Sequence, residues 1–265
     1  MAMSTEAMGE AGGPGSEPAE VEPAVEFTDV TMVLGGEPRV DSLTWRVPPG
    51  RVYGVLGPNG AGKSTVVNLI TGLLAATSGS VRVGGLDPVR DAVAVRRLIG
   101  LVPQADTVYP ELSGRENLRF HGALYVESMR EVPGRISEIL QLVELTDRAD
   151  DAVKTYSGGM RRRLCIGRAL MHRPRVLLLD EPTLGVDVQG TYRIWDYVKA
   201  LRDEGTTVIV TTNVMAEADY LCDDVVILDH GRRITSGSPA ELTRRSGVES
   251  LGEVFVAHTG RNLRD

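Results

Sequence analysis

The feature that most constrains the fold of this chain is a glycine-rich loop at residues 54–65, Gly-Val-Leu-Gly-Pro-Asn-Gly-Ala-Gly-Lys-Ser-Thr. It contains the spacing Gly57-x4-Gly62-Lys63-Ser64, which is the pattern of a phosphate-binding loop. Glycines let consecutive backbone N–H groups turn toward an anion, Lys63 adds a cation, and the Ser64 hydroxyl can ligate Mg²⁺. A helix that begins near Lys63 would direct its positive end at the same phosphates.

The surrounding sequence predicts the elements that such a loop requires. Residues 51–56 form a short apolar run typical of a strand, and apolar residues recur at helical spacing after the loop. Other runs that predict strands lie at residues 25–33, 43–47, 80–83, 99–102, 176–179, 206–211 and 225–228. Helical stretches at 192–201 and 214–221 separate the later strands, and residues from about 105 to 172 have a helical pattern. This alternation predicts an α/β fold with a largely parallel sheet and a helical insertion.

Composition narrows the function further. Residues 1–24 contain five glutamates and no Lys or Arg, and their Gly, Pro and Ala content predicts a disordered acidic tail. Because that tail accounts for most of the net charge of −7, the rest is nearly neutral, which argues against a nucleic-acid-binding protein. No apolar run reaches the roughly 18–20 residues of a membrane span, and we expect no signal peptide. The two cysteines fit a reducing cytosol.

Two carboxylates end one of the apolar runs. Val176 to Leu179 is followed directly by Asp180 and Glu181. Because side chains alternate along a strand, we expect the two carboxylates to point in different directions. One could then help to hold Mg²⁺ while the other accepts a proton from an attacking water. The alternative, an unrelated surface pair, loses weight because a phosphate loop precedes it in the chain.

A second candidate for phosphate binding lies inside the helical insertion. Ser157-Gly158-Gly159-Met160 combines a good N-cap residue with two glycines that would leave the helix end open to an anion. An ordinary turn and helix cap is the alternative. The arginines that follow, at 161–163, are by themselves more typical of a solvated helix face than of a ligand site.

Together these motifs resemble the nucleotide-binding subunit of an ABC transporter over about residues 25–235. The resemblance implies an α/β fold, a P-loop NTPase core of the ABC ATPase type, with N-terminal antiparallel strands and an inserted helical subdomain at about 105–172. Residues 236–265 would form a short C-terminal extension. The residues similar to the Walker A loop, all expected to bind ATP, are Gly57, Pro58, Asn59, Gly60, Ala61, Gly62, Lys63, Ser64 and Thr65.

The same resemblance assigns roles beyond the loop. Gln104 matches the Q-loop glutamine, which senses Mg²⁺ and couples to the membrane subunit, and Asp180 and Glu181 match the Walker B aspartate and the catalytic glutamate. Ser64, Gln104 and Asp180 are therefore the expected Mg²⁺ residues, and Glu181 and Gln104 are expected catalytic residues.

The remaining nucleotide contacts implied by the resemblance come from two further motifs. Ser157, Gly158 and Gly159 are similar to the family signature sequence, and Asp187 is similar to the D-loop aspartate.

Details of the sequence resemble one branch of the family. Tyr-Ser-Gly-Gly-Met-Arg-Arg-Arg-Leu at 156–164, and the ending at 251–265, are similar to ATPases of ABC-2-type drug exporters of the daunorubicin-resistance kind. The section between about Leu242 and Leu251 is shorter than is usual in that branch.

Two positions depart from the family pattern. Leu34 stands where an aromatic residue usually stacks on adenine, and it lacks the aromatic quadrupole. Asn213 occupies the position of the switch histidine, so it is the third expected catalytic residue. Asn is shorter than His and cannot carry a proton charge, which predicts slow ATP hydrolysis.

The leading hypothesis is an ATP-hydrolysing exporter subunit with ATP and Mg²⁺ as cofactors. ATP would lie between the phosphate loop of one copy and the Ser157 region of another, and dimer closure would drive a separate multi-span permease at the cytoplasmic face of the membrane. The cargo would be a drug, a lipid or a polysaccharide-like molecule. A second hypothesis is a degenerate, poorly hydrolysing partner in a heterodimer, indicated by Leu34 and Asn213. A third, a soluble ABC protein of translation or DNA repair, lacks the expected second cassette, coiled-coil insert and zinc motifs.

Overall fold

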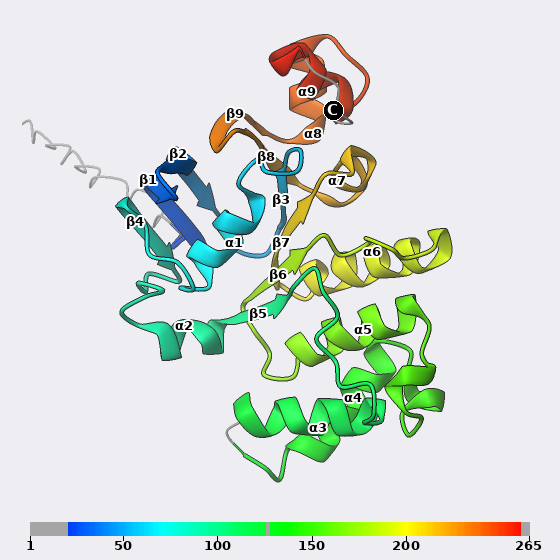
Figure 1. Cartoon of the computed structure of the whole chain (residues 1–265). Helices are drawn as coiled ribbons and strands as arrows, with labels where there is room; N and C mark the ends of the chain where they lie inside the picture. Colours follow the sequence, from blue (N-terminus) through cyan, green and yellow to red (C-terminus); the bar gives the residue numbers. More distant parts are fainter. Residues whose placement is uncertain (1–20, 126–127, 261–265) are drawn as a thin grey trace, which may run out of the picture.

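The computed structural model describes residues 21–125 and 128–260, which form two sheets with helices around them (Figure 1). The acidic tail predicted at 1–24 lies outside the described residues except for 21–24. The division of the chain at residues 24, 105, 172 and 235 stays a prediction.

The first sheet has three antiparallel strands in the order β2-β1-β4. These are β1 (Val25–Leu34), β2 (Glu37–Val47) and β4 (Ser78–Val83). The antiparallel N-terminal strands expected from the resemblance are therefore present. Phe27 and Trp45 pack their rings 6.0 Å apart at the centre of this sheet.

The second sheet has six strands in the order β5-β6-β7-β3-β8-β9. Its strands are β3 (Val52–Leu56), β5 (Ile99–Val102), β6 (Val176–Asp180), β7 (Thr207–Thr212), β8 (Asp224–Asp229) and β9 (Arg232–Gly237). All neighbouring pairs are parallel except β8 and β9, which are antiparallel. The sequence did not predict β9, because this partly exposed edge strand has no continuous apolar run.

Helices are present at the places that the periodicity predicts, namely after the phosphate loop, within about 105–172, and at about 192–201 and 214–221. The helices Ala92–Leu98, Pro239–Ser246 and Leu251–Thr259 were not predicted. In chain order, the helices of the described residues are α1 (Lys63–Ile70), α2 (Ala92–Leu98), α3 (Gly114–Tyr125), α4 (Val132–Leu142), α5 (Gly158–Ala169), α6 (Val188–Asp203), α7 (Met215–Leu221), α8 (Pro239–Ser246) and α9 (Leu251–Thr259). In Figure 1, α3, α4 and α5 lie together in green, away from the N-terminal strands, as the helical insertion predicts. No helix of the described residues is both long enough and apolar enough to cross a bilayer.

The central parallel strands are buried on both faces, as is usual for a parallel sheet covered by helices. Alternate residues therefore enter different cores. Leu177 and Leu179 pack with α5, α6 and α7, whereas Leu178 packs with α1 and the N-terminal sheet. The sheet is thus the rigid layer between two apolar clusters.

The register of three neighbouring strands aligns their carboxyl ends. Leu56 of β3 lies beside Thr212 of β7, and Asp180 of β6 lies beside Thr211. In open α/β sheets, ligands bind outside the carboxyl ends of the strands. The loops that follow these three strands therefore meet at the carboxyl end of the sheet, where the candidate site lies.

The C-terminal helix α9 belongs to the main core, and this generates a stability prediction. Phe255 is buried in the same apolar cluster as α7, whereas its neighbour Val256 is 38% exposed. Phe255→Ala should lower the free energy of unfolding by about 3–5 kcal/mol, because it removes a large buried side chain. Val256→Ala should change it by less than about 0.5 kcal/mol. Urea unfolding of both variants measures this, and equal midpoints would show that α9 does not stabilise the core.

Candidate functional site

The phosphate loop connects β3 to α1 and needs glycine for steric reasons. Gly57 has φ 153°, and a Cβ there would lie 2.3 Å from the carbonyl oxygen of Leu228. Gly62 has φ 106°, and a Cβ there would lie 2.4 Å from the carbonyl oxygen of Arg39. The loop is therefore held closely between β8 and β2, in a backbone conformation that larger residues rarely adopt.

The N-terminus of α1 opens directly from this loop. Its N-cap residue, Gly62, provides no side-chain cap, so the first N–H groups of the helix have no side-chain acceptor. Ser64 is exposed and Thr65 is half-buried in this first turn. Free N–H groups together with the helix dipole favour an anion at this end.

Lys63 lies under the loop and is only 5% exposed. Its Nζ donates to the carbonyl oxygens of Gly57 at 2.8 Å and Pro58 at 3.2 Å, and it lies 3.6 Å from Glu181 Oε1. Burial lowers the pKa of Lys63, and the carboxylate of Glu181 acts in the opposite direction. The structure thus brings together the predicted phosphate-binding lysine and the predicted catalytic carboxylate.

Asp180 and Glu181 diverge as predicted, but the reason is not strand alternation. Asp180 ends β6 and accepts a hydrogen bond from the Thr211 hydroxyl. Glu181 lies just after the strand, with φ 47°, and its N–H donates to the carbonyl oxygen of Thr211 at 2.9 Å. The left-handed backbone of Glu181 turns its carboxylate toward Lys63, while Asp180 stays against β7.

Gln104 reaches the same carboxylate from the end of β5. Val102 pairs with Leu179 in the parallel register, so the segment after β5 lies beside the end of β6. Gln104 Nε2 donates to Glu181 Oε2 at 3.1 Å. The three expected site residues Lys63, Gln104 and Glu181 are therefore neighbours.

Asn213 immediately follows β7, between the ends of β3 and β6. Its side chain is half-buried and makes no hydrogen bond among the described residues. Asn213 therefore lies at the same carboxyl end of the sheet as Glu181, and its side-chain amide is available to a ligand.

The predicted second phosphate element lies elsewhere in the chain. Ser157 caps α5 by accepting from Met160 N at 3.2 Å, as predicted, and Asp187 caps α6 by accepting from Gly190 N at 2.7 Å. A Cβ on Gly158 would lie 3.7 Å from the carbonyl oxygen of Gly185. Within the described part of the chain, no interaction joins Ser157, Gly158 or Asp187 to the phosphate loop.

Leu34 lies at the end of β1, where a two-glycine turn leads to Glu37 of β2. It is 38% exposed, so its apolar surface is accessible. The same hairpin approaches the phosphate loop through the Arg39 carbonyl oxygen beside Gly62. A base contact by Leu34 stays a prediction.

The donor set at this edge suits a hard cation that phosphate oxygens help to hold. No group of three His, Cys, Asp or Glu within residues 21–125 and 128–260 could bind a metal ion by itself. Mg²⁺ bound to phosphates needs only one or two protein oxygens. The Ser64 hydroxyl, the Asp180 carboxylate and the Gln104 amide oxygen fit this requirement.

Sequence reasoning missed Thr211 and Arg162, which both hold the end of β6. Thr211 holds both Asp180 and the Glu181 backbone, and its signal was a polar residue at the end of an apolar strand. The reading of residues 161–163 as a solvated face is wrong for Arg162 and Arg163, which are 3% and 8% exposed. Their guanidinium groups donate to backbone carbonyl oxygens, which no sequence pattern reveals.

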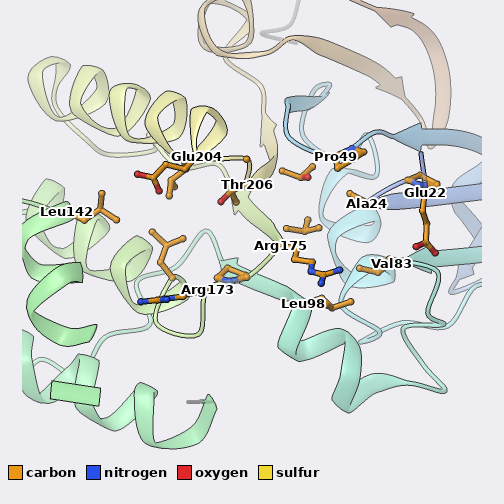
Figure 2. A pocket seen from close by; sticks show the side chains of 18 of the residues that line it. Glu22, Ala24, Pro49, Val83, Leu98, Leu142, Arg173, Arg175, Glu204 and Thr206 are labelled. Carbon is orange, nitrogen blue, oxygen red and sulfur yellow. The ribbon is translucent and has the colours of Figure 1, made fainter. Parts of the chain in front are cut away.

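A cavity of about 750 Å³ lies at the opposite end of the sheet, beside Val176 and Thr207 at the amino ends of β6 and β7 (Figure 2). Charged side chains of both signs line it, including Glu22, Glu204 and Arg175. It contains none of the predicted site residues.

Comparisons with known proteins identify the family of the chain. The family model described as ABC transporter matches residues 40–184. The linearmycin resistance ATP-binding protein LnrL of Bacillus subtilis (strain 168) is 40% identical over 88% of this chain and 75% of its own length. The daunorubicin/doxorubicin resistance ATP-binding protein DrrA of Streptomyces peucetius is 43% identical over 86% of this chain and 69% of its own length.

A solved structure shares the fold at greater sequence distance. The post-hydrolysis dimer of the ATP-binding cassette MJ0796, bound to ADP and Pi, has a TM-score of 0.72 and 27% identity, over 81% of this chain and 98% of that one. The chain therefore belongs to the ABC transporter family, as an ATP-binding subunit close to the ATPases of ABC-2-type exporters.

Proposed function

We propose that this chain hydrolyses ATP, with Mg²⁺, to drive an ABC-2-type exporter of drug-like or antibiotic cargo. The observation that carries the proposal is the position of the Glu181 carboxylate, 3.6 Å from Lys63 Nζ and 3.1 Å from Gln104 Nε2. A carboxylate beside a phosphate-binding lysine is where a base for an attacking water is needed. The names of the resistance relatives support the cargo class.

Each site residue at the carboxyl end of the sheet has a distinct role in this proposal. The N–H groups of the loop and the first turn of α1 bind phosphate oxygens, and Lys63 donates to the outer ones. Bound Mg²⁺ would neutralise phosphate charge, with Ser64, Asp180 and Gln104 as its holders. Thr211 fixes Asp180 and the Glu181 backbone, so the base is positioned before ATP arrives.

A second nucleotide-binding subunit, identical or homologous, completes the site. Ser157 and Asp187 lie apart from the phosphate loop of their own chain, and the N-terminus of α5 offers N–H groups to an anion. ATP bound between the loop of one subunit and the Ser157 region of another uses both elements. The dimeric relative bound to ADP and Pi supports this arrangement.

The membrane partner would dock beside the Gln104 segment, at the cytoplasmic face of the membrane. Tyr109 and Phe120 are 47% and 49% exposed and form an edge-on ring pair at 5.2 Å. Leu124, one helical turn farther along α3, is 64% exposed. Exposed apolar side chains that lie together are typical of a protein-binding surface. Docking there would link a permease to the segment that carries Gln104.

The first prediction tests the catalytic assignment. Glu181→Gln should keep ATP binding and lower the turnover number by at least about 10²-fold, because Gln is nearly isosteric but cannot accept a proton. Lys63→Ala should instead weaken ATP binding itself. Fluorescent-nucleotide titration and steady-state phosphate release separate the two effects. Turnover of Glu181→Gln at the parental rate would exclude Glu181 as the base.

The second prediction concerns Asn213 and the alternative of a degenerate partner. An Asn amide lacks the reach and charge of His, so Asn213→His should raise the hydrolysis rate about tenfold with little change in KM, and Asn213→Ala should lower it. Steady-state rates of the three proteins decide this. No ATP hydrolysis by any of them, with ATP still bound, would favour the degenerate partner of a heterodimer.

The third prediction concerns the base. Leu34 provides apolar contact only, whereas aromatic stacking contributes about 1–3 kcal/mol per base in nucleic-acid sites. Leu34→Tyr should therefore tighten ATP binding while leaving the affinity for inorganic triphosphate unchanged. Isothermal titration with both ligands measures the difference. Equal affinities for ATP in the two proteins would place the base away from this hairpin.

A further inference from the structure

Arginines of α5 hold the segment that follows β5 along its length. Arg162 Nη1 donates to the carbonyl oxygen of Pro103 at 2.5 Å and contacts that of Gln104 at 3.4 Å. Arg161 Nε donates to Asp106 at 3.0 Å, and Arg168 donates to Thr107. The backbone that carries Gln104 is therefore attached to the helix that Ser157 caps.

Arg162 differs from its neighbours because it also reaches the end of β6. Its Nη2 donates to the carbonyl oxygen of Asp180 at 2.7 Å and contacts that of Glu181 at 3.1 Å, and its Nε donates to that of Pro182 at 2.9 Å. One side chain thus contacts the main chain on both sides of the Gln104–Glu181 hydrogen bond.

The environment of Arg162 is unusual for a charged group. The side chain is 3% exposed, and no ion pair involving it occurs in the described part of the chain. Burying a cation without a carboxylate is costly unless its donors are satisfied. The guanidinium has a planar fork of donors, which here meets carbonyl oxygens of two separate segments; a lysine could not reproduce that geometry.

The Glu181 backbone needs such support. Its φ of 47° is a left-handed conformation that non-glycine residues rarely adopt, and it persists only where surrounding contacts hold it. Thr211 holds the N–H of Glu181, and Arg162 holds its carbonyl oxygen. The direction of the carboxylate therefore depends on both contacts.

We propose that Arg162 is a positioning residue that fixes Gln104 and Glu181 relative to each other and transmits displacement of α5 to them. Arg162 follows Ser157 by five residues on one rigid helix. When the N-terminus of α5 docks against a nucleotide held by another subunit, the same helix shifts Arg162 against the Gln104 and Glu181 backbones of its own chain. Arg162 thereby links occupancy of one site to the alignment of the base in the other. The proposal rests on the proposed function.

Arg163 provides the matched control. It is the next residue of α5 and is also buried, but its Nη1 donates to the carbonyl oxygens of Val143 at 2.9 Å and Glu144 at 3.2 Å. These acceptors lie after α4, away from the candidate site. Arg163→Gln therefore removes a buried arginine from the same helix without changing contacts to Gln104 or Glu181.

The test compares Arg162→Gln with Arg163→Gln in the full chain under conditions in which the parent hydrolyses ATP. Arg162→Gln should lower kcat by about 10²-fold, the cost of misplacing a reacting group by about 1 Å, with KM changed less than about threefold. Arg163→Gln should keep kcat within about threefold at a comparable loss in Tm. Arg162→Lys, which keeps the charge but not the fork, should lose about tenfold in kcat.

A double-mutant cycle separates positioning from general destabilisation. If Arg162 acts through the Gln104–Glu181 pair, Gln104→Ala and Arg162→Gln together should lower kcat by less than the product of their separate effects. Parental kcat in Arg162→Gln, equal kcat losses in Arg162→Gln and Arg163→Gln, or fully multiplicative losses in the cycle would each overturn the proposal. If Arg162→Gln does not fold, the kcat and KM of Arg162→Lys decide the question in the same way.

The failure of this proposal is distinguishable from failure of the proposed function. If the proposed function is wrong, the parent hydrolyses no ATP, or the parent and Glu181→Gln hydrolyse ATP at equal rates. Failure of the positioning role leaves those two proteins different and appears only in the Arg162 variants.

Discussion

The parallel register of β3, β6 and β7 sets the geometry of the candidate site. It places Leu56 beside Thr212 and Asp180 beside Thr211, so that the loops after three strands meet at one edge of the sheet. Both faces of these strands are buried in apolar clusters, so a one-residue change of register would move each core side chain into the opposite cluster, whose packing does not fit it. The geometry of the candidate site is therefore a consequence of core packing, and the site itself needs few additional contacts.

Main-chain atoms, rather than pairs of charges, hold most of this site together. Gly57 and Gly62 approach backbone carbonyl oxygens so closely that no side chain fits, and Lys63 donates to the carbonyl oxygens of Gly57 and Pro58. Arg162 likewise donates to backbone carbonyl oxygens of two segments. Such contacts fix the direction of the backbone with neutral acceptors, and Lys63 keeps a cation beside the loop where an anion would bind. This arrangement suits an ABC ATPase, whose ligand carries several negative charges.

The candidate site also divides between two surfaces of the chain. Lys63, Gln104 and Glu181 lie at the carboxyl end of the sheet, whereas Ser157 and Asp187 cap the N-termini of α5 and α6. Helix α5 connects the two, because its N-terminus carries the Ser157 cap and its next turn carries Arg162. The fold therefore provides a mechanical path within one chain between two parts of what we propose to be a site shared by two subunits.

Features that depend on neighbouring residues could be predicted from the sequence. The Gly57-x4-Gly62-Lys63-Ser64 spacing specifies a loop followed by a helix, the apolar runs specify most strands, and Ser157 specifies a helix cap, because each interaction spans only a few residues. Tertiary structure decided which residues meet across long separations. The left-handed turn at Glu181 depends on Thr211, which is 30 residues away, and the burial of Arg162 depends on carbonyl oxygens as far as 59 residues away. Local periodicity cannot encode these partners, since an arginine run on a helix reads the same whether water or backbone carbonyl oxygens face it.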